Sequence, residues 1–280
     1  MNKLVTSLLL LMILSASCQQ ASQTSCHSET ATASFASLGS DATFRNEHDT
    51  PEAISYAEKG KSISFPTPDG KNGSAYFIPA PEKSDKYIFV FHEWWGINDF
   101  VKRQSDLYAE TLKNVNVMAI DLYEGKVTTD REEAAKIMQS IDETRAKNII
   151  KGALTYVGKN AEIATVGWCF GGGWSLQGAL LAGKQTKGCV MYYGMPEEDV
   201  NKLKTLNSDV VFIFAKQDQW INDKVKEDFI IHMKEAGKTL TVKEYDADHA
   251  FANPSNPKYA KDAAADAEKI TLDYFKSRMD

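Results

Sequence analysis

This 280-residue chain lacks both an excess of basic residues and the common binding motifs. It has 32 Lys and Arg residues against 38 Asp and Glu, which gives a net charge of −6. Without a Lys/Arg block, nothing neutralises a run of nucleic-acid phosphates or binds an anionic membrane surface. The sequence has no P-loop, no dinucleotide-binding glycine motif and no metal-ligand spacing. We therefore expect no nucleic-acid partner, no cofactor and no metal site.

Cysteine is also scarce, with four residues whose spacing suggests no disulfide framework. Cys18 follows an apolar segment, and Cys26 lies in a polar stretch. Cys189 lies within the apolar run GCVMYYG and is expected to be a small core residue. Cys169 stands next to a glycine-rich turn, so it remains the candidate for a free, reactive thiol.

A long apolar run occurs at the start of the chain, where Lys3 precedes an apolar core from Leu4 to Leu14 and small residues follow. This pattern predicts a secretory signal peptide over residues 1–17, too short for a stable membrane anchor. The segment resembles a bacterial lipoprotein signal, in which the first cysteine, here Cys18, receives lipid. The leucine that this pattern places three residues before the cysteine stands one position earlier, at Leu14. Ordinary signal-peptidase cleavage at the same small residues is the alternative.

Residues 18–60 are rich in Ser, Thr, Ala and charge and show no sustained apolar period. This composition predicts a flexible tether. A tether of this kind would let a soluble domain, residues 61–280, stand off from a membrane that holds the start of the chain. We therefore expect an exported protein of the cell envelope whose membrane contact is a lipid anchor. The sequence does not indicate an oligomeric state.

From about residue 61, short β-rich runs alternate with helical stretches. The runs lie at residues 62–66, 74–80, 86–93, 115–123, 163–169, 188–194, 209–216 and 240–246. The middle runs are continuously apolar, which is typical of strands covered on both faces. We predict a doubly wound, mostly parallel α/β sheet flanked by helices, with an antiparallel pair at its start. Ligands of such sheets bind beyond the carboxyl ends of the strands, so polar residues that follow strands are the candidates for a site.

Helices are expected between these runs. The predicted stretches are 99–113, 129–157 with a break, 172–182, 222–236 and 257–278. Thr129 and Glu132 have the spacing of a capping box and are predicted to begin the second stretch.

The sequence GWCFG at residues 167–171 has the spacing of the nucleophile elbow G-x-S-x-G, with a thiol in place of the hydroxyl. A glycine-rich turn that contains a buried cysteine is the alternative. Asp218 and His249 follow two later strands, so the three candidates have the chain order nucleophile, acid, histidine of the α/β-hydrolase arrangement.

The chemistry of a thiol nucleophile calls for all three residues. A free thiol with a pKa of about 8.5 is only about 3% ionised at pH 7. Half ionisation requires about 2 kcal/mol, whereas a helix N-terminus supplies typically about 0.3–1 kcal/mol. A neighbouring imidazole is therefore needed, and we predict that His249 supplies it and that Asp218 orients His249.

Residues 61–280 resemble the dienelactone hydrolase family over nearly their whole length. The resemblance rests on the motifs FHEWWGIND, DLYEGK, GWCFGGG, KQDQW and DHAF. It implies an α/β-hydrolase fold and cofactor-free hydrolysis of an ester or lactone through Cys169. It also implies that Glu93 sits against the resting thiol and takes part in its activation. The backbone N–H groups of Trp94 and Phe170 would form the oxyanion hole.

Two positions depart from the family pattern. The enzymes that act on dienelactones carry two arginines that grip the substrate carboxylate, where this chain has Glu124 with Gly125, and Asn253. The ammonium of Lys126 does not replace a bidentate guanidinium. The substrate is therefore predicted to be something other than a simple anionic dienelactone.

Aromatic residues in and near the same motifs favour a bulky or apolar substrate. The candidates for substrate binding are Trp95, Tyr123, Trp220 and Phe251. Ordinary core packing is the alternative for each of them. For the whole protein, the alternative to an ester or lactone hydrolase is a non-catalytic binding lipoprotein on a hydrolase scaffold.

Overall fold

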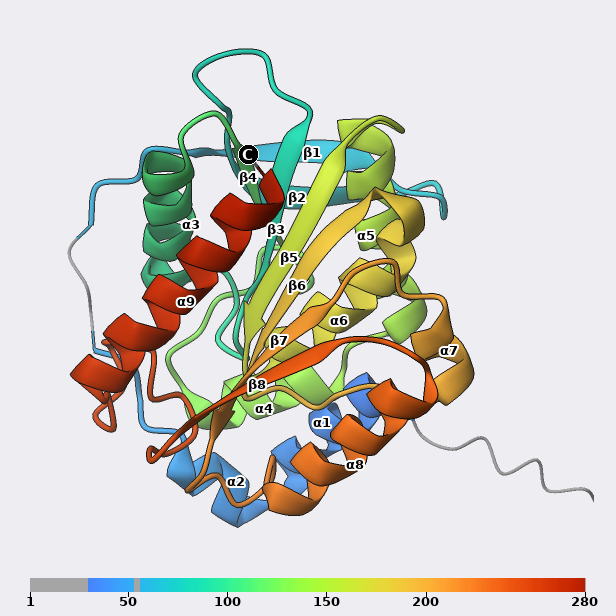
Figure 1. The fold of residues 1–280 in the computed structure, drawn as a ribbon. Helices are drawn as coiled ribbons and strands as arrows, with labels where there is room; N and C mark the ends of the chain where they lie inside the picture. Colours follow the sequence, from blue (N-terminus) through green and yellow to red (C-terminus); the bar gives the residue numbers. More distant parts are fainter. Residues whose placement is uncertain (1–29, 53–55, 280) are drawn as a thin grey trace, which may run out of the picture.

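The computed structural model describes residues 30–52 and 56–279, which form an eight-stranded sheet with helices on both faces (Figure 1). Every predicted run contains most or all of one strand. The strands are β1 (Lys61–Pro66), β2 (Asn72–Ile78), β3 (Lys86–Phe91), β4 (Asn116–Ile120), β5 (Glu162–Trp168), β6 (Thr186–Tyr192), β7 (Val210–Ala215) and β8 (Leu240–Tyr245).

The sheet has the order β1-β2-β4-β3-β5-β6-β7-β8. β1 and β2 pair antiparallel, β2 joins β4 antiparallel, and every later pair is parallel. The predicted doubly wound, mostly parallel sheet with an antiparallel pair at its start is therefore confirmed. β4, β5 and β7 are almost wholly buried, as expected for strands covered on both faces.

The helices cover the sheet in two layers. They are α1 (Ala31–Ser37), α2 (Ala42–Glu47), α3 (Asp99–Leu112), α4 (Arg131–Gln139), α5 (Glu143–Val157), α6 (Phe170–Ala182), α7 (Val200–Lys204), α8 (Asp223–Glu235) and α9 (Lys261–Met279). α3 and α9 pack on one face, and α5 and α6 on the other (Figure 1). Among the described residues, no helix combines the length and the apolar character that crossing a membrane requires.

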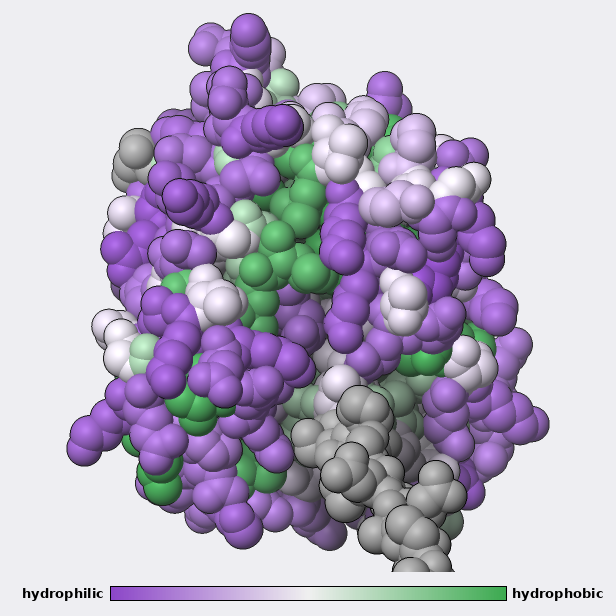
Figure 2. All heavy atoms as spheres, turned by 90° about the vertical axis from the view of Figure 1, so that its right-hand side faces the viewer, coloured by the Kyte–Doolittle hydropathy of each residue, from purple (hydrophilic) through white to green (hydrophobic). Residues whose placement is uncertain are grey.

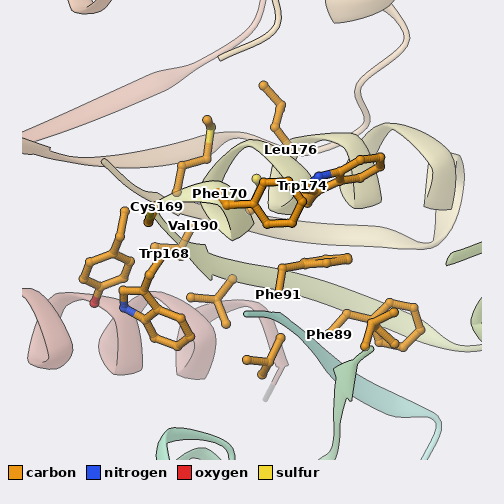
Figure 3. Close-up of a cluster of buried hydrophobic side chains, with 14 of the residues drawn as sticks. Phe89, Phe91, Trp168, Cys169, Phe170, Trp174, Leu176 and Val190 are labelled. Atoms are coloured by element: carbon orange, nitrogen blue, oxygen red, sulfur yellow. The ribbon is translucent and has the colours of Figure 1, made fainter. Parts of the chain in front are cut away.

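Aromatic side chains fill both interfaces between sheet and helices (Figure 3). Phe91 packs under α6, so close that a Cβ added at Gly178 would lie 2.7 Å from its ring. Trp168 takes the opposite side of the sheet and stacks on Tyr108 of α3, with ring centroids 6.4 Å apart. The last residues of β3 and β5 thus face opposite layers of the core, and Cys169 follows β5 directly at the edge of the sheet. The outer surface shows apolar side chains mainly in a central strip of the face in Figure 2.

The predicted second helical stretch breaks as expected, but its cap lies one residue later than predicted. Asp130, not Thr129, is the N-cap of α4, and its Oδ1 accepts a hydrogen bond from the Glu133 backbone N–H at 2.8 Å. The carboxylate of Asp130 is a stronger acceptor beside the positive end of the helix than a neutral hydroxyl.

The prediction of a flexible tether is wrong for residues 30–52, which we call the cover segment. Thr30 and Asp41 cap two short helices, α1 and α2, with hydrogen bonds to backbone N–H groups. Phe35 and Phe44 are buried, and α1 packs against α4 and α6. Burial of these side chains opposes the entropy cost of ordering a polar segment. Cys18 and the predicted signal peptide lie outside the described residues.

Candidate active site

Cys169 occupies a sharp turn between β5 and α6. Its φ of 57° lies in the left-handed region, which costs a non-glycine residue free energy. The flanking glycines permit the turn, because a Cβ at Gly167 would lie 2.0 Å from the Gly171 carbonyl oxygen. A Cβ at Gly171 would lie 2.2 Å from the carbonyl oxygen of Phe91. The GWCFG spacing therefore has the backbone geometry of a nucleophile elbow.

Asp218 and His249 meet beyond the ends of β7 and β8. His249 Nδ1 lies 2.5 Å from Asp218 Oδ2, while Asp218 Oδ1 accepts from the backbone N–H of Trp220 at 2.9 Å and of Ile221 at 3.0 Å. A ring nitrogen of His249 lies within 4.8 Å of Cys169 Sγ. The structure thus brings together the three side chains that the sequence singled out, from positions up to 80 residues apart.

The electrostatics of this group follow from its burial and its neighbours. Burial alone would lower the pKa of His249, but the proximity of Asp218 and of Cys169 outweighs it and holds the pKa well above its usual range. Burial would raise the pKa of Asp218, yet His249 and two backbone N–H groups hold it below its usual range. The arrangement favours a carboxylate beside an imidazole that readily takes up a proton.

Glu93 follows β3 and is 2% exposed. His92 shapes this turn, since its Nδ1 donates to the Glu93 carbonyl oxygen at 2.7 Å and its Nε2 accepts from the Leu122 N–H at 3.2 Å. Glu93 Oε2 accepts a hydrogen bond from Asn253 at 2.7 Å, and Oε1 has no partner among the described residues. Burial raises the pKa of Glu93 to about 7, against the opposing effects of Asn253 and His249. Glu93 lines the same small cavity as Cys169, with no hydrogen bond to its thiol.

The two predicted oxyanion-hole residues flank the same space. Phe170 is the first residue of α6, so its N–H has no acceptor within the helix. Trp94 follows Glu93, lines the cavity beside Cys169 and is fully buried. Both residues therefore lie next to Cys169, one in the chain and one across the cavity.

His48, on the cover segment, is a site residue that the sequence analysis missed. Its Nε2 lies 3.9 Å from Cys169 Sγ, and its Nδ1 donates to the Phe44 carbonyl oxygen at 2.7 Å. The ring lies between Trp94 and His249, at centroid distances of 4.4 and 5.0 Å. Burial, reinforced by His249, lowers the pKa of His48 to about 3, so the ring is neutral at pH 7. A lone histidine in a polar stretch carries no sequence signal for this position.

The cover segment leaves very little room above the thiol. The cavity lined by His48, Glu93, Trp94, Trp95 and Cys169 has a volume of about 10 Å³. A water molecule occupies about 30 Å³ in the liquid and needs at least about 10–15 Å³ of such space. In this conformation the site is closed to any ester or lactone.

The predicted substrate-binding aromatics divide into three groups. Trp95 lines the cavity. Trp220 contacts the cover segment through Phe44, at a centroid distance of 5.0 Å, and Tyr123 packs on Phe170 at 5.4 Å. Phe251 does not line the cavity: it is fully buried between two tyrosines, so the alternative of core packing holds for it.

Tyr193 is a second residue that the sequence did not single out. It follows β6 with a φ of 36°, and its ring centroid lies 5.0 Å from that of His249. Its hydroxyl is buried without a hydrogen-bond partner among the described residues. The sequence signal that could have identified Tyr193 as a site residue is its position directly after the carboxyl end of a central strand.

The profile of the dienelactone hydrolase family matches residues 74–279. The chain belongs to the dienelactone hydrolase family. It is 26% identical over 216 residues to Protein usf of Aquifex pyrophilus, and the matched region covers 72% of this chain and 93% of that protein. It is also 27% identical over 115 residues to a carboxymethylenebutenolidase of Pseudomonas sp. (strain P51), or 41% of this chain and 47% of that one.

Solved structures share the dienelactone hydrolase fold of this chain. A dienelactone hydrolase-like promiscuous phosphotriesterase from metagenomic libraries superposes with a TM-score of 0.65 at 18% identity, over 79% of this chain and 99% of that one. An esterase of Pyrococcus furiosus superposes with a TM-score of 0.60 at 12% identity, over 83% of this chain and all of the other. At these identities the comparison establishes the fold alone.

The residues of this chain at the two arginine positions of the dienelactone-cleaving enzymes make other contacts. Glu124 accepts a hydrogen bond from Arg145 Nη2 at 2.7 Å. Asn253 donates to Glu93, as described above. Lys126 does not line the cavity beside Cys169, and no other lysine or arginine of the described chain lines it. The closed site therefore offers no cation to a substrate carboxylate.

Proposed function

We propose that this protein hydrolyses a neutral carboxylic ester or lactone through a thioester at Cys169. The observation that carries the proposal is the placement of His249 between Asp218, at 2.5 Å, and the thiol of Cys169 on a nucleophile elbow. Membership of the dienelactone hydrolase family and the likeness to a carboxymethylenebutenolidase support the reaction class.

The proposed reaction has two halves. In the first, His249 Nε2 takes the proton of the Cys169 thiol, and the thiolate attacks the carbonyl carbon. The tetrahedral oxyanion is stabilised by the N–H groups of Phe170 and Trp94, and His249 returns the proton to the leaving alcohol oxygen. In the second half, His249 takes a proton from water, the hydroxide cleaves the thioester, and the thiol reforms as the acid leaves. Asp218 holds the ring orientation and stabilises the imidazolium throughout.

Glu93 has a proposed part in the resting enzyme. A carboxylate near the thiol disfavours the thiolate by like-charge repulsion, and it accepts a proton readily because its pKa is raised to about 7. Its Oε1, which has no hydrogen-bond partner among the described residues, is the atom that would accept a hydrogen bond from the thiol after a small rotation. Glu93 would then keep Cys169 neutral until a substrate displaces the carboxylate.

Catalysis also requires the cover segment to move. A cavity of about 10 Å³ above the thiol holds no substrate, and His48 lies where an acyl group would approach Sγ. α1 and α2 have 7 and 6 residues, short lengths that are marginal without tertiary packing. We infer that the cover segment opens as a unit and that the observed state is the resting one.

The export of the protein remains part of the proposal. The signal-like segment and Cys18 suggest a lipid-anchored hydrolase of the cell envelope, with the catalytic domain outside the membrane.

Trapping of the covalent intermediate tests the function. Wild-type protein mixed with a neutral chromogenic ester should release a burst of alcohol, and mass spectrometry of the quenched protein should find the acyl group on Cys169. Cys169→Ala should abolish both signals, and Asp218→Asn should slow turnover. Cys189→Ala is the matched control and should retain the burst. A protein that binds the ester without a burst, or an acyl adduct on another residue, would refute the proposal and favour a non-catalytic binding protein.

A further inference from the structure

We propose that His48, Cys169 and His249 form a zinc site that locks the cover segment onto the nucleophile. The ligand atoms are one ring nitrogen of each histidine and Cys169 Sγ, and all three lie within 4.8 Å of one another in a buried position. His48 follows the end of α2, Cys169 precedes the start of α6, and His249 lies in the loop after β8. They meet only when the cover segment is closed.

The spacing is close to that of a tetrahedral zinc site. With Zn–S of about 2.3 Å and Zn–N of about 2.0–2.1 Å, tetrahedral ligand atoms lie about 3.4–3.6 Å apart. Cys169 Sγ and His48 Nε2 are 3.9 Å apart, and the widest separation in the group is 4.8 Å or less. Contraction by on the order of 1 Å, through small side-chain rotations, completes the geometry.

Both histidines are already oriented as ligands. His48 Nδ1 donates to the Phe44 carbonyl oxygen, which leaves the lone pair of Nε2 on the side of the thiol. His249 Nδ1 bonds to Asp218, and its Nε2 is buried without a hydrogen-bond partner in the described chain. A carbonyl on one imidazole and a carboxylate on the other are the outer partners that metal-bound histidines typically have.

The remaining coordination position has room for one small ligand. The cavity of about 10 Å³ is lined by His48, Cys169 and Glu93, about the space for one water molecule. Two imidazoles, one thiolate and a water form a donor set that suits Zn²⁺, whereas Mg²⁺ and Ca²⁺ prefer oxygen ligands. On binding, the S–H bond of Cys169 breaks, the Sγ–Zn bond forms, and one proton passes to the solvent.

Zinc bound at this site inhibits the proposed reaction reversibly and holds the cover segment closed. Zinc occupies the thiolate and the imidazole that the proposed reaction uses, and the bond to His48 ties the cover segment to the domain. Oxidation of a thiol follows its thiolate character and its exposure, and a metal-bound thiolate in a closed site is less accessible to oxidants. Metal binding does not depend on the proposed ester hydrolysis, so each can fail without the other.

Cobalt(II) tests the site directly, because it takes the place of zinc and reports its ligands by colour. Titration of the full-length protein should produce a thiolate-to-cobalt charge-transfer band and the visible bands of tetrahedral Co²⁺, and zinc should displace the cobalt at one equivalent. His48→Ala removes a direct ligand and should weaken zinc affinity in calorimetry by more than the about tenfold that loss of an outer partner costs. His48→Gln, which keeps the volume of the ring more closely, should weaken it equally.

His232→Ala is the matched control, since His232 lies on α8, outside the cluster. It should leave both the cobalt spectrum and the zinc affinity unchanged. Cys169→Ser should lose the charge-transfer band. Wild-type protein without a tetrahedral cobalt spectrum would overturn the proposal. Equal zinc affinity for wild type and both His48 variants would overturn it as well, because Cys169 and His249 alone would then account for binding.

Discussion

Replacement of Phe44 by alanine should activate the enzyme. Phe44 is fully buried on α2, and its ring packs on His48, Trp220 and Trp94 at centroid distances of 4.2, 5.0 and 5.6 Å. These contacts exist only while the cover segment is closed. Phe44→Ala therefore destabilises the closed state and leaves the open state nearly unchanged.

The size of the effect follows from the burial. Truncation of a fully buried phenylalanine costs about 3–5 kcal/mol, and the lower end applies here because the cover segment lies at the surface and can relax. At 1.4 kcal/mol per factor of ten, about 3 kcal/mol shifts the closed-to-open ratio by on the order of 100-fold. The kcat/KM of an ester that binds only the open form rises by the same factor, until the open form predominates.

Steady-state kinetics with a small neutral ester measures this rise, and hydrogen exchange of the α2 backbone should report faster opening in the same variant. Phe229→Ala is the control for general destabilisation. Phe229 is also fully buried, but it lies on α8 and packs on Phe212 at 5.7 Å, away from the cover segment. This control should lower the melting temperature without raising kcat/KM.

A fall in kcat/KM for Phe44→Ala, with α2 exchange accelerated, would refute the reasoning. It would mean that the cover segment is a wall of the substrate site, needed for binding, and not a barrier to it. An unchanged kcat/KM together with faster α2 exchange would mean that opening does not limit access to Cys169.

Four further predictions concern the thiol, the buried carboxylate, the substrate and the anchor. A stoichiometric thiol reagent should label Cys169 ahead of Cys189, whose pKa burial raises to about 11, and should abolish activity; peptide mapping that finds Cys189 labelled with activity lost would contradict this. Because burial raises the pKa of Glu93 from 4.5 to about 7, the folded state binds its proton more tightly, and the free energy of unfolding should fall by up to about 3 kcal/mol as pH rises from about 4.5 to 7. Glu93→Gln should flatten that slope in denaturant titrations, and an unchanged slope would assign it to other groups. Neutral esters should have higher kcat/KM than matched carboxylate-bearing ones, and a tenfold preference for the anion, about 1.4 kcal/mol, would reveal a cation in the open site. Wild-type protein should fractionate with membranes and Cys18→Ala should not; wild type recovered soluble with an unmodified residue 18 would contradict lipidation.

The sheet could be predicted from the sequence because each strand is marked by an apolar run of neighbouring residues. Continuous apolar runs such as residues 209–216 have few alternatives to a strand buried on both faces. The elbow was also predictable, since close backbone contacts at Gly167 and Gly171 exclude any side chain and leave their signature at fixed spacing. Asp218 and His249 could be placed because the topology of a parallel sheet brings strand ends to one edge.

The cover segment was not predictable by the same reasoning. Its apolar residues, chiefly Phe35 and Phe44, are isolated among Ser, Thr and Ala and show no helical period long enough to detect. The local signals present were the caps Thr30 and Asp41, each of which begins a helix of 7 residues or fewer. Such helices form only where tertiary contacts stabilise them, and those contacts involve residues more than 80 positions away on α4 and α6.

His48 could be identified as a site residue only from the structure. Nothing in the chain near His48 marks it, because its role depends on a docking event, not on its neighbours. Once docked, it contacts Cys169 Sγ, which the elbow positions, and approaches His249, which Asp218 orients. The residues that perform the proposed chemistry are thus held by strand ends, whereas the residue that closes the site follows α2, a helix of only 6 residues. That division is what a controllable hydrolase requires: the catalytic geometry persists while the cover segment opens at a cost set by a few aromatic contacts.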